Sequence, residues 1–350
     1  MKILYIYLFQ GLGDAVLLLP ILAGFQANNP DVDLGVLVRN RTAEVISRSI
    51  FRGHVHILDE ILVSQEFTNL TEPLAPPKRR SRREVYLAYR AIQNELNEVQ
   101  YDIAVDATYK MGINSQRLLR CSGANSLYGW VKTEQEAKRR CLSGWIVDNR
   151  FDGSMHWVQY CCKPLELVKP FSPLFDNSLK SCPLTHQTES KCKVVVIPGS
   201  NDTLKRWPSE CFAHVINELI EKFNISVTFL VTEEETSLIE KLVLAINVDT
   251  EFAVEVSFQS MVDIISNATL VLTNDTGPMH VAFLLDVPTV AIYRSRYDAV
   301  TTVWGTFPKN RSAILFKEIC HTDSMTSTKI SATDVYLASE RIVKSAFNIP

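Results

Sequence analysis

The stretch Asn274–His280 carries residue types that could bind an anion at the start of a helix. Thr276 and Gly277 could present backbone N–H groups and a hydroxyl to a phosphate, because exposed amides at a helix start attract negative charge. Asp275 and His280 are close enough in the sequence to flank such a group. The alternative is an aspartate that caps the helix, beside a histidine satisfied in the core.

Two cations form a second candidate for holding an anion. Lys205 and Arg206 stand just before a predicted helix, where exposed amides add roughly half a positive charge. They follow a turn that contains Ser200 and the strand predicted at 193–197. A solvated Lys–Arg pair above a packed tryptophan is the alternative.

A third candidate is the turn from Gly11 to Asp14, between a predicted strand and a predicted helix. Glycines at positions 11 and 13 permit close approach of another backbone. Asp14 stands at the mouth of the helix, where it could face a ligand or simply cap the helix. The turn is not a dinucleotide-binding G-x-G-x-x-G motif, because Val16 replaces the third glycine.

Carboxylates near a third strand could bind a sugar hydroxyl. Glu233–Glu235 follow the strand predicted at 225–231, so one of them, for which we choose Glu234, could reach a ribose at the same sheet edge. A solvated helix start is the alternative. No metal site is predicted, because Asp31 and Asp33 stand at the start of their predicted strand and not after its end, and no cysteines have zinc spacing.

Strands and helices that alternate along the chain must position these residues. Strands separated by helices imply parallel βαβ units, and this pattern occurs twice. We therefore predict an α/β protein with two Rossmann-like domains facing each other across a cleft, where ligands bind at the carboxyl ends of both sheets. The domains are expected at 1–170 and 185–330, with a C-terminal helix at about 331–350 that returns to the first domain. The predicted strands are 3–9, 31–38, 102–106, 193–197, 225–231, 270–273 and 288–293, and amphipathic helices are expected at 85–99 and from Pro208 to Phe223.

Two segments interrupt the alternation. Residues 64–83 contain three prolines, end in the basic run Lys78–Arg83 and lack an apolar period, so we expect a long loop. Residues 163–192 are rich in Pro, Ser, Lys and Thr, and this composition predicts an interdomain linker.

Charge and hydropathy exclude several classes of function. The 350 residues include 36 Lys and Arg against 39 Asp and Glu, a net charge of −3, so a basic footprint for nucleic acid is absent. No apolar run reaches the roughly 18 residues of a membrane span, and the N-terminus does not read as a signal peptide. These features, with eight scattered cysteines, predict a cytoplasmic protein with reduced thiols.

Together these motifs resemble glycosyltransferase family 9, the bacterial lipopolysaccharide heptosyltransferases with the GT-B fold. The order and spacing of the motifs agree over about residues 1–295, with two departures: Thr232-Glu233-Glu234 stands where the family usually has glycines, and Tyr293-Arg294 replaces an aromatic–glycine pair. The resemblance rests on Gly11–Asp14 with Pro20, on Gly199 with Lys205–Pro208 and on Asn274–His280, and more weakly on 106–115 and 288–290.

The resemblance implies an inverting transfer of heptose from an ADP-sugar donor to a sugar of the lipopolysaccharide core, without a further cofactor. Asp14 matches the family's general base, a role typically worth about 10²–10⁴ in rate. Lys205, with the amides of Thr276 and Gly277, would stabilise the departing diphosphate in place of a metal. The implied donor-binding residues are Ser200, Arg206, Glu234, Asp275, Thr276, Gly277 and His280.

In this family the N-terminal half binds the acceptor, which is anionic. The basic run Lys78–Arg83 is hypothesised to grip the acceptor or the inner-leaflet surface, where a basic residue contributes about 1 kcal/mol. A solvated loop is the alternative. We therefore expect a cytoplasmic enzyme with peripheral contact at the inner face of the inner membrane. The implied acceptor-binding residues are Gly11, Gly13, Lys78, Arg79, Arg80 and Lys110.

Two other interpretations stay open. One is a GT-B enzyme that uses a different nucleotide sugar, including an epimerase. The other is a non-catalytic protein that binds a nucleotide sugar. The presence of both Asp14 and Lys205 argues against the second, because a degenerate site need keep neither.

Overall fold

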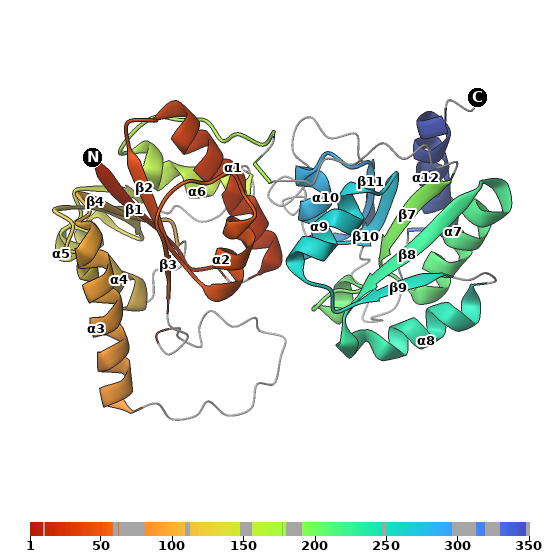
Figure 1. The fold of residues 1–350 in the computed structure, drawn as a ribbon, viewed down its shortest axis with the longest axis horizontal. Helices are drawn as coiled ribbons and strands as arrows, with labels where there is room; N and C mark the ends of the chain where they lie inside the picture. The colour runs from red at the N-terminus through yellow and green to blue at the C-terminus, as the bar shows by residue number, and fades with distance from the viewer. Residues whose placement is uncertain are drawn as a thin grey trace. The chain divides into compact units, whose positions relative to one another are not determined.

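The computed structural model divides the chain into two units, Met1–Leu179 and Lys180–Pro350, each built around one parallel β-sheet (Figure 1). This confirms the predicted α/β class with two Rossmann-like domains. The structure describes residues 1–9, 11–58, 62, 81–108, 113–147, 156–176, 178–179, 191–246, 250–295, 313–318 and 330–347.

The first sheet has the strand order β3-β2-β1-β4-β5-β6. Its central strands are continuous apolar runs because helices cover both of their faces. This is the Rossmann order. The direction in which successive strands are added to the sheet reverses between β1 and β4, and ligands bind beyond the carboxyl ends of the strands at that switch point. The strands are β1 (Lys2–Tyr7), β2 (Asp33–Val38), β3 (Val55–Ile57), β4 (Ile103–Asp106), β5 (Ser126–Val131) and β6 (Gly144–Val147).

Helices cover both faces of the first sheet. One face carries α1, which contacts α2 and α6, and α3 contacts α4 on the other. Helix α1 is apolar all round because neighbouring helices and the sheet enclose it. The helices are α1 (Leu12–Asn28), α2 (Asn40–Ser47), α3 (Arg82–Val99), α4 (Ile113–Cys121), α5 (Glu134–Arg140) and α6 (Trp157–Glu166).

The second sheet repeats this topology. Its order is β12-β11-β10-β7-β8-β9. Read from β9 to β12, with β7 counted as the first strand, this is the same order as in the first sheet. The second switch point therefore lies between β7 and β10. The strands are β7 (Cys192–Ile197), β8 (Ile225–Val231), β9 (Glu251–Val254), β10 (Leu270–Asn274), β11 (Thr289–Ser295) and β12 (Ala313–Glu318).

The helices of the second unit also form two layers. Helix α7 contacts α8 and α12, and α9 contacts α10. The 3-10 helices η3 and η4 follow β7 and β8. Their bounds are η3 (Thr203–Lys205), η4 (Glu233–Glu235), α7 (Ser209–Lys222), α8 (Thr236–Ala245), α9 (Phe258–Ser266), α10 (Gly277–Leu284) and α12 (Ala332–Phe347).

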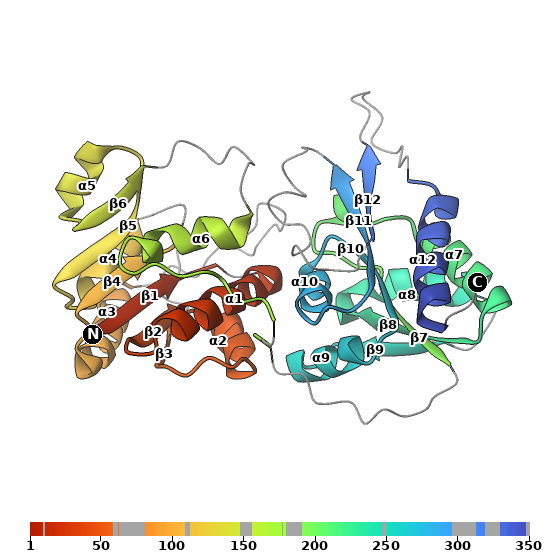
Figure 2. The same ribbon diagram turned by 90° about the horizontal axis from the view of Figure 1, so that it is seen from above.

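The C-terminal helix belongs to the second unit. Helix α12 packs beside α7, as Figures 1 and 2 both show. Two hydrogen bonds tie this region down: Trp207 Nε1 donates to the carbonyl of Ile330 (3.3 Å), and Lys222 Nζ donates to the hydroxyl of Tyr336 (2.9 Å). The buried faces of Val335 and Val343 complete the core over α7.

The boundary between the two units falls inside the linker predicted at 163–192, but the first part of that range belongs to the first unit. Helix α6 extends to Glu166, and the chain after it packs back on α1 of the first unit. The amide of Leu174 donates to the carbonyl of Pro20 (2.9 Å), and the Ser172 carbonyl lies so close to Gly24 that no Cβ would fit. A segment rich in Pro and Ser can therefore belong to a domain surface when its backbone finds partners there.

The loop predicted at 64–83 ends earlier than expected. Ser81 caps α3, accepting a hydrogen bond from the amide of Glu84 (3.2 Å), so Arg82 and Arg83 lie in the first turn of that helix. The rest of the predicted loop, residues 64–80, lies outside the described residues. In the described part of the chain, no helix is long and apolar enough to cross a membrane.

Candidate functional site

The switch point of the second sheet brings Lys205 and Asp275 together. Lys205 follows β7 and Asp275 follows β10, and Lys205 Nζ lies 2.6 Å from Asp275 Oδ2. The lysine side chain is 39% exposed, whereas the aspartate side chain is only 10% exposed. This arrangement holds a cation at the sheet edge through a nearly buried carboxylate, and leaves the cation accessible to an anionic ligand.

Asn274 joins the two loops that carry this ion pair. Its Nδ2 donates to the carbonyl of Pro198 (2.7 Å), and its Oδ1 accepts from the amide of Trp207 (3.1 Å). Asn274 is fully buried, so both of its bonds are shielded from water. Ser200 strengthens the same junction by donating to the carbonyl of Asp275 (3.4 Å). Sequence reasoning gave Asn274 no role, because both of its partners are far away in the chain.

Thr276 and Gly277 stand where a helix begins, as predicted. Thr276 is the N-cap of α10, and Pro278 occupies its first turn. In the described structure no side chain caps this helix start, so its amides can serve an anionic ligand. His280 is buried one turn further on, with its ring edge-on to Phe283.

A buried glutamate lies beside these loops. Glu235 is 6% exposed; it accepts a hydrogen bond from the amide of Thr232 (2.9 Å), and Arg206 lies 3.7 Å from its Oε1. Its carboxylate fills the space where a Cβ at Gly199 would lie, which explains the glycine after β7. Glu234, the residue chosen from the sequence, is exposed on η4. The burial of Glu235 depends on the turn into α8, which the run of three glutamates does not reveal.

Arg206 is held by the same loop. Its Nε donates to the carbonyl of Ser200 (2.8 Å), while its guanidinium faces Glu235. The second switch point thus gathers two cations, two buried carboxylates that pair with them, and one uncapped helix start on the carboxyl ends of three neighbouring strands. Of the predicted donor-binding residues, Ser200, Arg206, Asp275 and Thr276 lie in these loops.

At the switch point of the first sheet, Asp14 lies in the first turn of α1. Its Oδ2 accepts a hydrogen bond from the amide of Gly11 (3.1 Å), so the capping role considered from the sequence is real. Its backbone carbonyl accepts from the hydroxyl of Tyr7 (2.9 Å). Asp14 is half-buried, which leaves its carboxylate able to meet a ligand as well.

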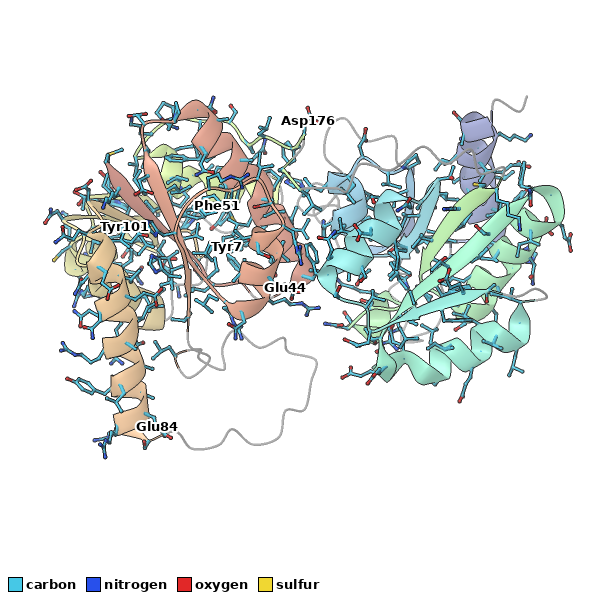
Figure 3. All side chains as sticks on the ribbon, in the orientation of Figure 1. Tyr7, Glu44, Phe51, Glu84, Tyr101 and Asp176 are labelled. Atoms are coloured by element: carbon cyan, nitrogen blue, oxygen red, sulfur yellow. The ribbon has the colours of Figure 1, made fainter. Side chains whose placement is uncertain are left out.

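Tyr7 belongs to a buried aromatic cluster behind Asp14; its label in Figure 3 lies inside the first unit. Trp157 Nε1 donates to the Tyr7 hydroxyl (3.3 Å), and Phe9 packs edge-on between the two rings. Burial raises the pKa of Tyr7 well above its ordinary value, so the hydroxyl stays protonated. The cluster therefore fixes the start of α1, and with it the position of Asp14.

Asp106 ends β4 at the same switch point. It is fully buried, pairs in register with Ile6 of β1, and its Oδ1 accepts from the amide of Thr108 (2.7 Å). Burial raises its pKa to about 6, although the bond from Thr108 opposes that shift. The first switch point thus has two carboxylates, one half-buried on the helix and one buried on the strand.

Two of the six predicted acceptor-binding residues lie in the described part of the chain. Lys78, Arg79, Arg80 and Lys110 lie outside the described residues. Gly13 lies within α1, and the turn residue Gly11 precedes that helix. No group of three or more His, Cys, Asp or Glu that could hold a metal occurs within the ranges that the structure describes.

Solved structures of low sequence identity share this fold. The glycosyl transferase family 9 protein of Veillonella parvula superposes with a TM-score of 0.78 at 17% identity, covering 98% of this chain and 97% of that one. The E. coli heptosyltransferase WaaC with ADP has a TM-score of 0.74 at 17% identity, covering 98% and 100%. The E. coli ADP-heptose lps heptosyltransferase II has a TM-score of 0.72 at 17% identity, covering 99% and 100%.

Sequence comparisons agree. The lipopolysaccharide core heptosyltransferase OpsX of Haemophilus influenzae is 28% identical over 107 residues, a stretch that spans only 30% of this chain and 30% of OpsX. The sequence model of "Glycosyltransferase family 9 (heptosyltransferase)" matches residues 89–328, well over half of the chain and most of the second unit. The chain therefore belongs to glycosyltransferase family 9.

Proposed function

We propose that this protein is an inverting glycosyltransferase that moves a heptose from ADP-heptose to a sugar of the lipopolysaccharide inner core. The observation that carries the proposal is the second switch point, where Lys205 pairs with Asp275 beside the uncapped start of α10. A cation and helix amides on one sheet edge suit a diphosphate, which is the leaving group of a nucleotide sugar.

In the proposed reaction, Asp14 takes the proton from an acceptor hydroxyl. The hydroxyl oxygen forms a bond to the anomeric carbon of the donor, and the bond from that carbon to the diphosphate breaks. ADP leaves with the electron pair of the broken bond. Attack opposite the leaving group inverts the anomeric centre and needs only this one base.

The departing diphosphate gains negative charge as the bond breaks. Lys205 would stabilise that charge together with the amides of Thr276 and Gly277, because fixed donors at a sheltered site act without reorganisation. Arg206 adds a second positive charge on the same loop. With this donor set, the proposed reaction requires no cofactor beyond the sugar donor.

The nucleoside would lie beside the buried carboxylate. Glu235 adjoins both the β7 loop and Arg206, so it fits a ribose hydroxyl better than the exposed Glu234. ADP as the nucleotide follows from two of the similar solved structures: one is described with ADP and another as an ADP-heptose enzyme. The core sugar as acceptor follows from the description of OpsX.

The acceptor would be held by the first unit, with the basic residues Lys78, Arg79, Arg80 and Lys110 matching its carboxylates and phosphates. Neutralising these four positions should raise the acceptor KM and leave ADP binding unchanged. An unchanged acceptor KM would exclude them from acceptor binding.

The deciding experiment is mass spectrometry of truncated core oligosaccharides incubated with the protein and ADP-heptose. The expected result is a product one heptose heavier, formed together with ADP. Calorimetric titration with ADP, UDP and GDP separates donor classes. Transfer from a UDP- or GDP-sugar only would favour a different nucleotide-sugar enzyme, and nucleotide binding with no transfer to any acceptor would favour a binding protein.

A further inference from the structure

The outer face of α3 carries an exposed stripe that the proposed reaction does not use. Arg83, Tyr86, Leu87 and Arg90 follow the i, i+3, i+4, i+7 spacing of a single helix face. Tyr86 is 61% exposed and Leu87 is 54% exposed. Scattered exposed apolar residues are ordinary, but here two adjoin each other between two arginines. We call these four residues the α3 stripe.

The stripe points away from the core of the first unit. Ala88, Ile92 and Leu96 are the buried positions of α3 and belong to the core beneath it. The stripe residues lie on the opposite side of the helix, because 100° separates successive residues. In Figure 1 the first turns of α3 extend beyond the end of β3, and Figure 3 labels Glu84 at that outer end. The stripe therefore lies on the solvent face of the first half of α3, while Ala88 on the opposite face meets the core.

The charge around the stripe is positive. Arg82 is exposed beside it, and Glu84 is the only acidic residue of α3 before Glu95. The Glu84 carboxylate is turned back to the helix start, where it accepts hydrogen bonds from the amide of Ser81 (2.7 Å) and from its hydroxyl (2.8 Å). Glu95 in turn contacts His56, with Oε1 2.5 Å from Nδ1. Neither carboxylate is directed along the stripe.

We propose that the α3 stripe docks the protein on an anionic phospholipid surface. Arginines attract anionic headgroups, while an adjacent tyrosine and leucine are suited to the boundary between headgroups and acyl chains. An apolar protein partner would match Tyr86 and Leu87 but would have to desolvate the two arginines. Charge complementarity therefore favours the membrane. The inference goes beyond the proposed reaction, because binding to lipid needs neither donor nor acceptor.

Vesicle cosedimentation of the full chain tests this. We expect binding to vesicles of phosphatidylethanolamine and phosphatidylglycerol, little binding to phosphatidylcholine alone, and release by added salt. The double variant R83Q/R90Q should lower the partition coefficient roughly tenfold or more. The double variant Y86Q/L87Q should lower it by roughly tenfold as well, because it removes the inserted apolar area.

Matched variants separate the stripe from general charge and hydropathy. K138Q/R139Q removes two exposed cations of the same unit from α5, and L244Q/L337Q removes two exposed leucines from the second unit. Both should bind vesicles like the unaltered protein, and the affinity of every variant for ADP should be unchanged. Equal loss in these controls, or full vesicle binding by both stripe variants, would overturn the proposal. The alternative outcome is that the unaltered protein does not bind vesicles but forms a dimer in solution, and that only the stripe variants are monomeric. That result would assign the stripe to contact with a second copy instead.

Discussion

Lys205 and Asp275 form an ion pair across the second switch point, with Nζ 2.6 Å from Oδ2. The aspartate is fixed by its own backbone, because its amide donates to the carbonyl of Ile292 (3.1 Å) and its carbonyl accepts from Ser200. The lysine has no such backbone anchor to the β10 loop and is more exposed. A bound diphosphate could therefore share the lysine without disturbing the loop that holds Asp275.

The first prediction concerns the charge of Lys205. Lys205→Met should lower kcat by roughly 10²–10³-fold, because it removes a donor that acts mainly on the charge formed in the transition state. Steady-state transfer from ADP-heptose measures the effect. Lys241→Met is the matched control, since that lysine is exposed on α8, and its kcat should be unchanged. A Lys205→Met enzyme with full kcat would leave the ion pair a structural role only.

The second prediction separates catalysis from capping at Asp14. Asp14→Asn keeps an oxygen that can accept from the amide of Gly11 but cannot take a proton, so Tm should change little while transfer falls by about 10²–10⁴-fold. Affinity for ADP, measured by calorimetry, should be unchanged. Asp31→Asn, at an exposed ion pair with Lys169 in the same unit, is the control. A variant at position 14 that loses stability and keeps its activity would point to the cap alone.

The third prediction distinguishes Glu235 from Glu234. Glu235→Gln should weaken ADP binding by roughly tenfold, because hydrogen bonds to charged groups contribute about 1.5–3 kcal/mol. Glu234→Gln should have a smaller effect, since its side chain is exposed. Glu233→Gln is the control, because it removes one negative charge from η4 at a position with no proposed role; its affinity for ADP should be unchanged. The reverse ranking of the first two variants would support Glu234, the residue chosen from the sequence.

The fold was predictable where strands are long apolar runs. Strands such as β1 and β10 lie in sheet centres, and burial on both faces leaves an unbroken hydrophobic signal in the sequence. Edge strands such as β3 and β9 were missed, because they are short and partly exposed. The apolar face of α12 identifies a helix in the sequence but not the surface that it covers, which in the structure includes α7.

The candidate site was predictable where a motif is local. The turn after β10 and the start of α10 lie within seven residues, so their position at a helix start follows from strand–turn–helix order alone. The bonds of Asn274 to Pro198 and Trp207 span 76 and 67 residues, and no local pattern carries them. The choice between Glu234 and Glu235 depends on which carboxylate faces Gly199, which only the packed loop decides.

The fourth prediction concerns stability and pH at Asp106. Burial raises its pKa from 3.8 to about 6, so the native state binds this proton more tightly than the unfolded chain does. Its contribution to stability is therefore present at low pH and is lost as pH rises through about 6. Asp106→Asn removes the titration and keeps an acceptor for Thr108. The free energy of unfolding of the variant relative to the unaltered protein should rise by about 2.5 kcal/mol between pH 4 and pH 8. A difference that stays flat with pH would contradict this.

The fifth prediction uses the end of α3. Gln100 is exposed and adopts φ 57°, ψ 71°, the left-handed conformation, while its amide donates to the carbonyl of Leu96 (3.3 Å). A residue with a Cβ is disfavoured there by about 1 kcal/mol, and glycine is not. Gln100→Gly should therefore raise the free energy of unfolding by about 1 kcal/mol, measured by urea titration with an unchanged m-value. Gln93→Gly, in the middle of the same helix, should lower it by about as much. If both variants were destabilised equally, the left-handed end of the helix would not be strained at Gln100.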